Sequence, residues 1–217
     1  EYIQLHPHSR WNPSLLLSLG RVYYLNGYFV RAINAWSNSW SAVRHTEDIP
    51  SRELGDRAVA ELLHLLAKIG RYDEMEAIIA QIGDHQPAGS AGVKYDAALR
   101  GLNQMKTRPD LAFKCGPYAL GEIYSCITSN RLMPSAVADV SSSTQGTSLS
   151  EVAGLASLIG LDMVPAVRLG EDAEIIVPSV MHWRVGHFAA LVRRSGEHYL
   201  VRDPTFGDEF WITKEAI

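Results

Sequence analysis

The sequence predicts an α+β protein in which helices occupy the first part of the chain and strands the last. Apolar residues recur at helical spacing through roughly the first hundred residues, whereas alternation with a period of two appears only beyond about residue 160. The texture changes between these two regions. We therefore predict a helical region over 10–105 and an α+β domain, with helices packed on an antiparallel sheet, over 106–217.

Composition and charge exclude several classes of protein. Hydrophobic residues make up 47% of the 217 residues and charged residues 20%, as in ordinary globular domains. No apolar run approaches the roughly 20 residues of a membrane-spanning helix. A net charge of −4 without Lys/Arg clusters argues against nucleic acid as a partner. The chain opens without methionine or a signal peptide and stops where a helix pattern begins, so we expect a piece of a longer protein, from an unknown compartment.

The helical region is predicted to consist of paired antiparallel helices. Apolar and small residues recur at helical spacing over 16–40, and Trp36 and Trp40 are expected to pack inside this pair. Five positions resemble the consensus of a tetratricopeptide repeat, with the glycine at 27 as the turn: Leu19, Gly20, Tyr23, Gly27 and Ala32.

A weaker second copy of the repeat has its turn at Gly70. Its spacing from the first turn exceeds the length of a standard repeat, so we expect an inserted linker over 47–52 that contains Pro50. A helix over 91–105 is expected to complete the array before Pro109. Because two repeats are few, a scaffold is favoured over a peptide-binding groove.

The second half is predicted to hold two helices followed by strands. One helix is expected over 116–129, then a polar turn over 141–148. A second helix starts at a capping box of Ser148 and Glu151 and ends at Gly160. Five strands are then expected, over 162–169, 173–183, 186–194, 198–204 and 208–213.

A predicted hairpin connects His187, at the start of one strand, to Asp203, at the end of the next. A two-residue loop at Ser195-Gly196 would place the two side chains on opposite faces, whereas a three-residue loop over 194–196 would pair them directly. We therefore predict the three-residue loop. The carboxylate would then fix the imidazole tautomer and leave the other ring nitrogen to accept a proton from a nucleophile.

Cys115 is the predicted nucleophile. Gly116 and Pro117 suit the start of a helix, whose dipole would stabilise a thiolate. A cysteine at a helix start, followed by His and Asp on adjacent strands, is the papain-like arrangement. The alternative for Cys115 is an ordinary core thiol, which is also the role expected of Cys126.

Three segments, CGPYAL at 115–120, SLSEVAGLASLIGL at 148–161 and VPSVMHWRVGHFAALV at 177–192, followed by YLVRDPTFG, resemble the double-glycine-leader cysteine peptidases that trim bacteriocin precursors. The resemblance spans about residues 103 to 217 and implies a papain-like thiol protease without a cofactor. It implies Cys115 as the nucleophile, His187 as the general base and acid, and Asp203 as the group that orients the imidazole.

The same resemblance implies a peptide substrate with small residues, such as Gly-Gly, before the cleaved bond. Similar segments that follow helical repeats occur in large bacterial proteins with Rhs or YD repeats. In that setting the substrate would be a segment of the parent polypeptide or a neighbouring precursor.

One position departs from the family pattern. The family usually carries a glutamine six residues before the cysteine, whose amide helps to form the oxyanion hole, and Pro109 stands there in this sequence. Loss of such a donor costs about 10²- to 10³-fold in rate. The backbone N–H of Cys115 remains as a donor, and Gln104 and Gln145 are candidate substitutes that their spacing does not support.

Four further residues are expected to line the substrate cleft: Gly116, His182, Trp183 and Gly186. His182 competes with His187 for the role of base, but no acidic residue stands at the offset needed to orient it. We expect no metal site, because these two histidines lack a further Cys or carboxylate ligand in the sequence around them.

Two rival functions remain open. A transglutaminase-like acyltransferase would use the same three residue types and pass the acyl group to an amine instead of water. A catalytically impaired binding module would hold a peptide without cleaving it, because the usual oxyanion-hole glutamine is missing.

Overall fold

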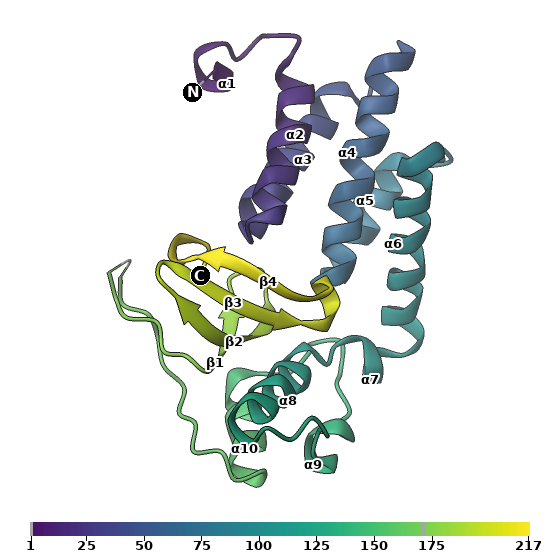
Figure 1. Cartoon of the computed structure of the whole chain (residues 1–217). Coiled ribbons are helices and arrows are strands. Elements are labelled where there is room, and N and C mark those ends of the chain that lie inside the picture. The colour runs from purple at the N-terminus through teal and green to yellow at the C-terminus, as the bar shows by residue number, and fades with distance from the viewer. Residues whose placement is uncertain (1, 171) are drawn as a thin grey trace. The chain divides into compact units, whose positions relative to one another are not determined.

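The computed structural model describes residues 2–170 and 172–217, and its architecture is α+β, as the sequence predicts (Figure 1). The chain divides into two compact units, the first ending at Asn103 and the second running from Gln104 to Ile217. The boundary lies inside the helix Gly89–Thr107, close to the predicted boundary between residues 105 and 106. Each unit is described by itself.

The first unit is entirely helical and is built from helices joined by short turns. Contacts run mainly between neighbours in the sequence, so that α2 packs on α3, α3 on α4 and α4 on α5. Its helices are α1 (Tyr2–Leu5), α2 (Asn12–Leu25), α3 (Phe29–Val43), α4 (Ile49–Lys68), α5 (Tyr72–Ile82) and α6 (Gly89–Thr107).

Glycines make the two predicted turns. Gly27 and Gly70 both have positive φ, 79° and 74°, a conformation that favours glycine. Gly20 serves a different purpose, because a Cβ added there would collide with the indole of Trp36. That indole is 1% exposed and donates to the carbonyl of Leu17 at 3.1 Å, so it packs between α2 and α3 as expected.

The expected linker over 47–52 is wrong from Ile49 onward, where α4 begins. The carboxylate of Asp48 caps α4 by accepting from the backbone N–H of Ser51 at 3.4 Å, and Pro50 lies in the first helical turn. Proline is tolerated there because its missing N–H would have no intrahelical partner. The extra spacing between the turn glycines is therefore taken up largely by α4 itself, which has 20 residues against 14 in α2.

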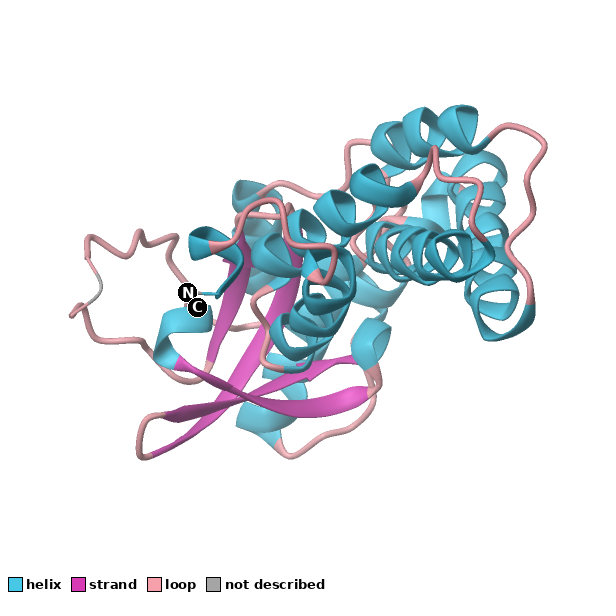
Figure 2. Cartoon of the chain, turned by 90° about the horizontal axis from the view of Figure 1, so that it is seen from above, coloured by secondary structure: helices cyan, strands magenta, loops and turns pink. Residues whose placement is uncertain are grey.

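The second unit places helices on a four-stranded antiparallel sheet in the order β1-β2-β3-β4 (Figures 1 and 2). Figure 1 shows α8, α9 and α10 gathered on one side of this sheet. The helices are α7 (Pro109–Ala112), α8 (Cys115–Thr128), α9 (Ser135–Ala138) and α10 (Leu149–Leu158). The strands are β1 (Ser179–Trp183), β2 (His187–Ser195), β3 (His198–Asp203) and β4 (Asp208–Thr213), with short 3-10 turns η1 (Pro204–Phe206) and η2 (Lys214–Ala216).

The core of this unit lies between α8 and β2. Apolar residues at helical spacing on α8 meet alternate residues of β2, and α10 closes the side. The capping box predicted at Ser148 and Glu151 is present at the start of α10. These contacts fix the start of α8 against the start of β2. The core residues contributed by the three elements include Ala119, Leu120, Ile123, Val152, Phe188 and Ala190.

Two of the five expected strands are wrong in whole or in part. Residues 162–169 form no strand, and the second predicted strand begins at Ser179 instead of 173. Val164, Val167 and Leu169 are all at least 80% exposed, so the apolar side chains that suggested a half-buried strand have no sheet to cover. The segment runs outside the helices and the sheet as an extended connection from α10 to β1 (Figure 1).

Candidate active site

Cys115 is the first residue of α8, one position earlier than the predicted start of the helix. Pro117 lies in the first turn, where it removes no needed hydrogen bond. The thiol is partly buried and packs against the core of the unit. Its place at the N-terminal end of a 14-residue helix puts it where backbone N–H groups and the helix dipole favour negative charge.

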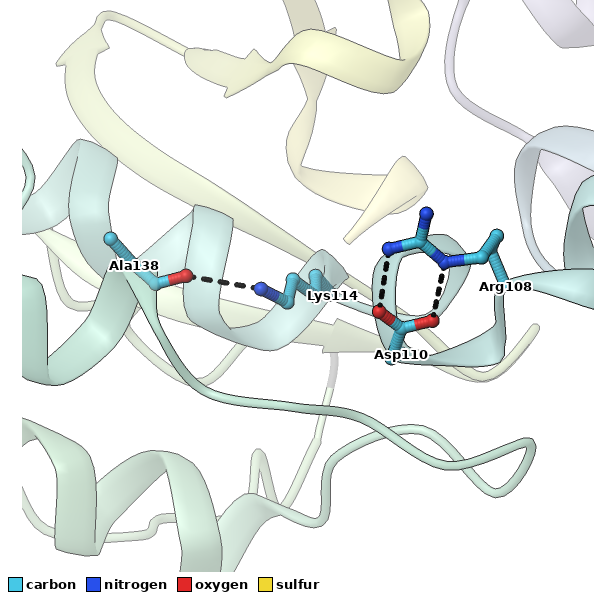
Figure 3. A network of polar contacts seen from close by, with 4 residues as sticks. All are labelled: Arg108, Asp110, Lys114 and Ala138. Carbon is cyan, nitrogen blue, oxygen red and sulfur yellow. Dashed lines mark hydrogen bonds and ion pairs between the residues drawn. The ribbon is translucent and has the colours of Figure 1, made fainter.

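Polar contacts just before Cys115 anchor this end of the helix (Figure 3). The ammonium of the buried Lys114 donates to the carbonyl of Ala138, at the end of α9, at 3.0 Å. The guanidinium of Arg108 forms two hydrogen bonds with the carboxylate of Asp110, at 3.1 and 3.0 Å, across the start of α7. Lys114 was not anticipated from the sequence, because a lysine beside a nucleophile gives no pattern that predicts its burial.

His187 and Asp203 form a buried pair. Nε2 of His187 lies 2.6 Å from Oδ2 of Asp203, and the two residues are 2% and 4% exposed. The other carboxylate oxygen, Oδ1, accepts from the backbone N–H of Thr205 at 2.9 Å. Both oxygens of the carboxylate are therefore held, and the imidazole is left with Nδ1 for a second partner.

The predicted three-residue loop is wrong, although the two side chains do meet. Ser195 pairs with His198, so the turn contains only Gly196 and Glu197. With this turn alone, a regular ladder would place Asp203 across from Ala190, whose side chain points to the face opposite His187.

A β-bulge in β2 brings Asp203 onto the same face of the sheet as His187. Arg193 pairs with Leu200 and Leu191 pairs with Val201, which leaves Val192 as an extra residue on β2. Beyond the bulge, the register places Asp203 across from Ala189, which shares a face with His187. The two side chains are thus diagonal neighbours and not a direct cross-strand pair.

The electrostatics couple Cys115 to His187. Burial acts to raise the pKa of the thiol, but the hydrogen bond and charge of His187, with backbone hydrogen bonds from Phe188 and Gly116, outweigh it and lower the pKa. Burial acts to lower the pKa of His187, but its hydrogen bonds to Asp203 and Cys115, and the charges of those two groups, raise it to about 9. This combination favours a thiolate beside an imidazolium at neutral pH.

Aromatic rings surround the imidazole. The rings of Trp183 and His187 are stacked with centroids 6.2 Å apart, and Phe206 meets the imidazole edge-on at 5.5 Å. Phe206 also contacts Phe210 of β4. Phe206 was not predicted as a site residue, and the one signal for it in the sequence is its position three residues after Asp203.

The four residues expected to line the cleft lie in different environments. His182 is exposed and stacks on Phe188 with centroids 4.1 Å apart, while Trp183 is 6% exposed. Gly186 is exposed in the turn before β2, with φ 80°. Gly116 is buried, and a Cβ there would lie 2.9 Å from Cγ2 of Val152. Partial burial of the ring, where it stacks on Phe188, and the charge of His187 both lower the pKa of His182.

Neither of the two glutamines that could substitute for the one missing at position 109 is buried. Pro109 begins α7, and the side chains of Gln104 and Gln145 are both exposed. The backbone N–H of Ser142 donates to the carbonyl of Asp110 at 3.5 Å, and its hydroxyl is buried without a hydrogen-bond partner among the described residues.

Cys126 was expected to be a core residue, and this expectation is wrong. Its side chain is exposed on the last part of α8. It lines a cavity of about 700 Å³ together with charged residues that include Glu122, Arg202 and Glu209. Cys115, His187 and Asp203 do not line this cavity. Over residues 2–170 and 172–217, no three His, Cys, Asp or Glu side chains gather as potential metal ligands, and no helix is long and apolar enough to cross a membrane.

Comparisons of the chain with protein-family models, with curated proteins and with solved structures found no match. The family resemblance therefore stays a prediction.

Proposed function

We propose that the second unit is a papain-like cysteine peptidase domain in which Cys115, His187 and Asp203 act as a catalytic triad. The observation that carries this proposal is the almost wholly buried pair of His187 and Asp203, 2.6 Å apart, together with the influence of His187 that lowers the pKa of the Cys115 thiol. Burial raises the strength of these contacts, because little water competes for the imidazole. Burying an ionisable pair costs desolvation energy, so a purely structural core gains little from it.

The proposed reaction is amide hydrolysis through a thioester. The thiolate of Cys115 attacks the carbonyl carbon, the C–N bond breaks, and the imidazolium of His187 gives its proton to the leaving amine. Water then attacks the thioester and gives a proton to His187, the C–S bond breaks, and the acid is released. Asp203 keeps the imidazole oriented throughout. The N-terminal end of α8 offers the backbone N–H of Cys115 to the oxyanion.

The proposed substrate is a peptide with small residues before the cleaved bond, either a segment of a parent polypeptide or a neighbouring precursor. The support is the sequence resemblance together with the exposed Gly186, which leaves room beside the start of β2. The first unit is proposed as a tetratricopeptide-like scaffold, supported by its positive-φ turn glycines and by the packing of Trp36 at Gly20.

A peptide ending in a vinyl sulfone, with Gly-Gly before the warhead, tests the proposal. We expect one label per chain on the wild-type protein, found at Cys115 by mass spectrometry, and no label on Cys115→Ala or His187→Ala. Cys126→Ala is the matched control, since it removes the exposed thiol and should retain the label. Intact, folded wild-type protein that leaves Cys115 unlabelled would overturn the proposal.

A second arm separates hydrolysis from acyl transfer. A small-residue peptide substrate is incubated with a labelled primary amine, and both products are quantified. A free acid as the main product supports a peptidase. Predominant incorporation of the amine would instead assign an acyltransferase, which uses the same thioester. Labelling of Cys115 without either product would identify a binding module.

A further inference from the structure

Trp183 packs on His187 from the neighbouring strand. It is the last residue of β1, and its indole plane is tilted by only 15° from the imidazole plane. Nε1 of the indole donates to the carbonyl of Ala216 at 3.1 Å, in a buried hydrogen bond. The ring is therefore fixed at two places, by stacking on the imidazole and by the backbone of η2.

The turn η2 has a second anchor. Nη1 of Arg168, in the extended connection before β1, donates to the carbonyl of Lys214 at 3.1 Å. Trp183 and Arg168 come from different segments. Both donate to backbone carbonyls of the three-residue turn η2. The position of η2 thus depends on both contacts, and the indole depends on η2.

Other groups complete the surroundings of the imidazole. Phe206 from η1 covers its edge, and Trp183 and Phe210 lie with ring centroids 6.4 Å apart. The titratable groups that act on the ring are Cys115 from α8 and Asp203 from β3, with His182 of β1 further out. Because apolar rings surround the imidazole, little water competes for its hydrogen bonds.

We propose that Trp183, held by η2, is a positioning residue for the general base and not a contact for the substrate. It limits rotation of the imidazole and keeps water from the His187–Asp203 hydrogen bond. The contact between Arg168 and η2 supports this role from a distance. The inference rests on the proposed function, because it assumes that His187 is the base for Cys115.

The test compares two Trp→Phe variants in a Cys126→Ala background. Trp183→Phe keeps an aromatic ring but removes the N–H that binds Ala216. Trp211→Phe is the matched control, since Trp211 lies on β4, is 40% exposed and packs under the guanidinium of Arg193. Alkylation of Cys115 by iodoacetamide is measured from pH 4 to pH 10, with thermal melting of each variant alongside.

We expect the midpoint of alkylation to move to higher pH in Trp183→Phe. The rate at low pH should fall about tenfold, the change that one pKa unit produces. Trp211→Phe should follow the wild-type profile. A purely structural role would lower the melting temperature without moving the midpoint, and a Trp183→Phe profile that matches the wild type would overturn the inference.

The outcomes keep the inference and the proposed function apart. If the wild-type thiol reacts only with the pH dependence of the unfolded chain, both fail. If it reacts at low pH and Trp183→Phe does the same, only the positioning role fails. Should Trp183→Phe not fold, Arg168→Gln carries the test, because it releases η2 from the other side. Its profile is expected to move in the same direction, and an unchanged profile would overturn the inference.

Discussion

Oδ2 of Asp203 lies 2.6 Å from Nε2 of His187, and the same carboxylate accepts the backbone N–H of Thr205 through Oδ1. The carboxylate is thus fixed by the first residues of η1 and cannot turn away from the imidazole without losing a hydrogen bond. This arrangement stabilises the imidazolium and sets which ring nitrogen faces the thiol.

Replacing Asp203 with asparagine keeps the shape of this residue and removes its charge. We expect the rate of Cys115 alkylation at pH 6 to fall, and peptide turnover to fall by on the order of 10²- to 10⁴-fold, because the imidazolium loses its counter-charge. Circular dichroism and thermal melting would show that the fold remains. Turnover within about twofold of the wild type would contradict the role given to Asp203.

Peptide turnover is expected to occur within a bounded pH window. The pKa of Cys115 is lowered, so the thiolate is lost only as the pH falls through that lowered value. The pKa of His187 is raised from 6.5 to about 9, so the imidazolium persists through neutral pH and is lost as the pH rises through about 9. Between these two pKa values Cys115 is a thiolate and His187 is an imidazolium.

Two measurements check this window against the unfolded chain, whose thiols should titrate near their usual pKa of about 8.5. Alkylation of folded protein in the Cys126→Ala background should begin well below that pH. Turnover should decline above about pH 9, where His187 no longer carries the proton for the leaving amine, while alkylation continues. A folded thiol that titrates together with the unfolded one would contradict the ion pair.

His182 is expected to be dispensable for the reactivity of the thiol. Its ring stacks on Phe188 and is exposed, and its pKa is lowered by burial and by the charge of His187. His182→Phe should keep the stacking and leave alkylation within about threefold of the wild type, with any loss appearing in KM. His187→Phe, the matched variant, should abolish alkylation at pH 6. Loss in both variants would reassign the base.

The residue types of the site could be predicted from the sequence, but the reason that they meet could not. Cys115 at a helix start and His187 and Asp203 at strand ends are local features. The bulge at Val192 is not, since it depends on how β2 fits α8 and β3 together. Counting residues along a hairpin predicts the face of the sheet on which a side chain lies only when every residue on both strands has a partner.

Strand prediction failed where burial did not follow apolar alternation. Val164 and Val167 belong to a pattern that indicates a strand, but among the described residues no strand pairs with them, and they are exposed. The burial of Lys114 was equally hidden, because it depends on a carbonyl from α9 that lies 24 residues further along the chain. Long-range contacts of this kind decide burial more than local sequence does.

Gly116 is expected to be intolerant of any side chain, for a reason of packing. A Cβ there would lie 2.9 Å from Cγ2 of Val152, closer than real contacts allow, and 3.3 Å from Cβ of Thr147, which is also tight. Gly116→Ala should therefore lower the free energy of unfolding by about 1–3 kcal/mol. The helix start would shift away from α10, so the rate of Cys115 alkylation at pH 6 should fall as well.

Gly154→Ala provides the control for this last prediction. Gly154 lies within α10, and a Cβ there meets nothing within 4 Å, so the substitution should stabilise the helix by about 0.5–1 kcal/mol. Chemical denaturation of both variants measures the two free energies. Equal effects in the two variants would show that Gly116 does not pack closely against α10.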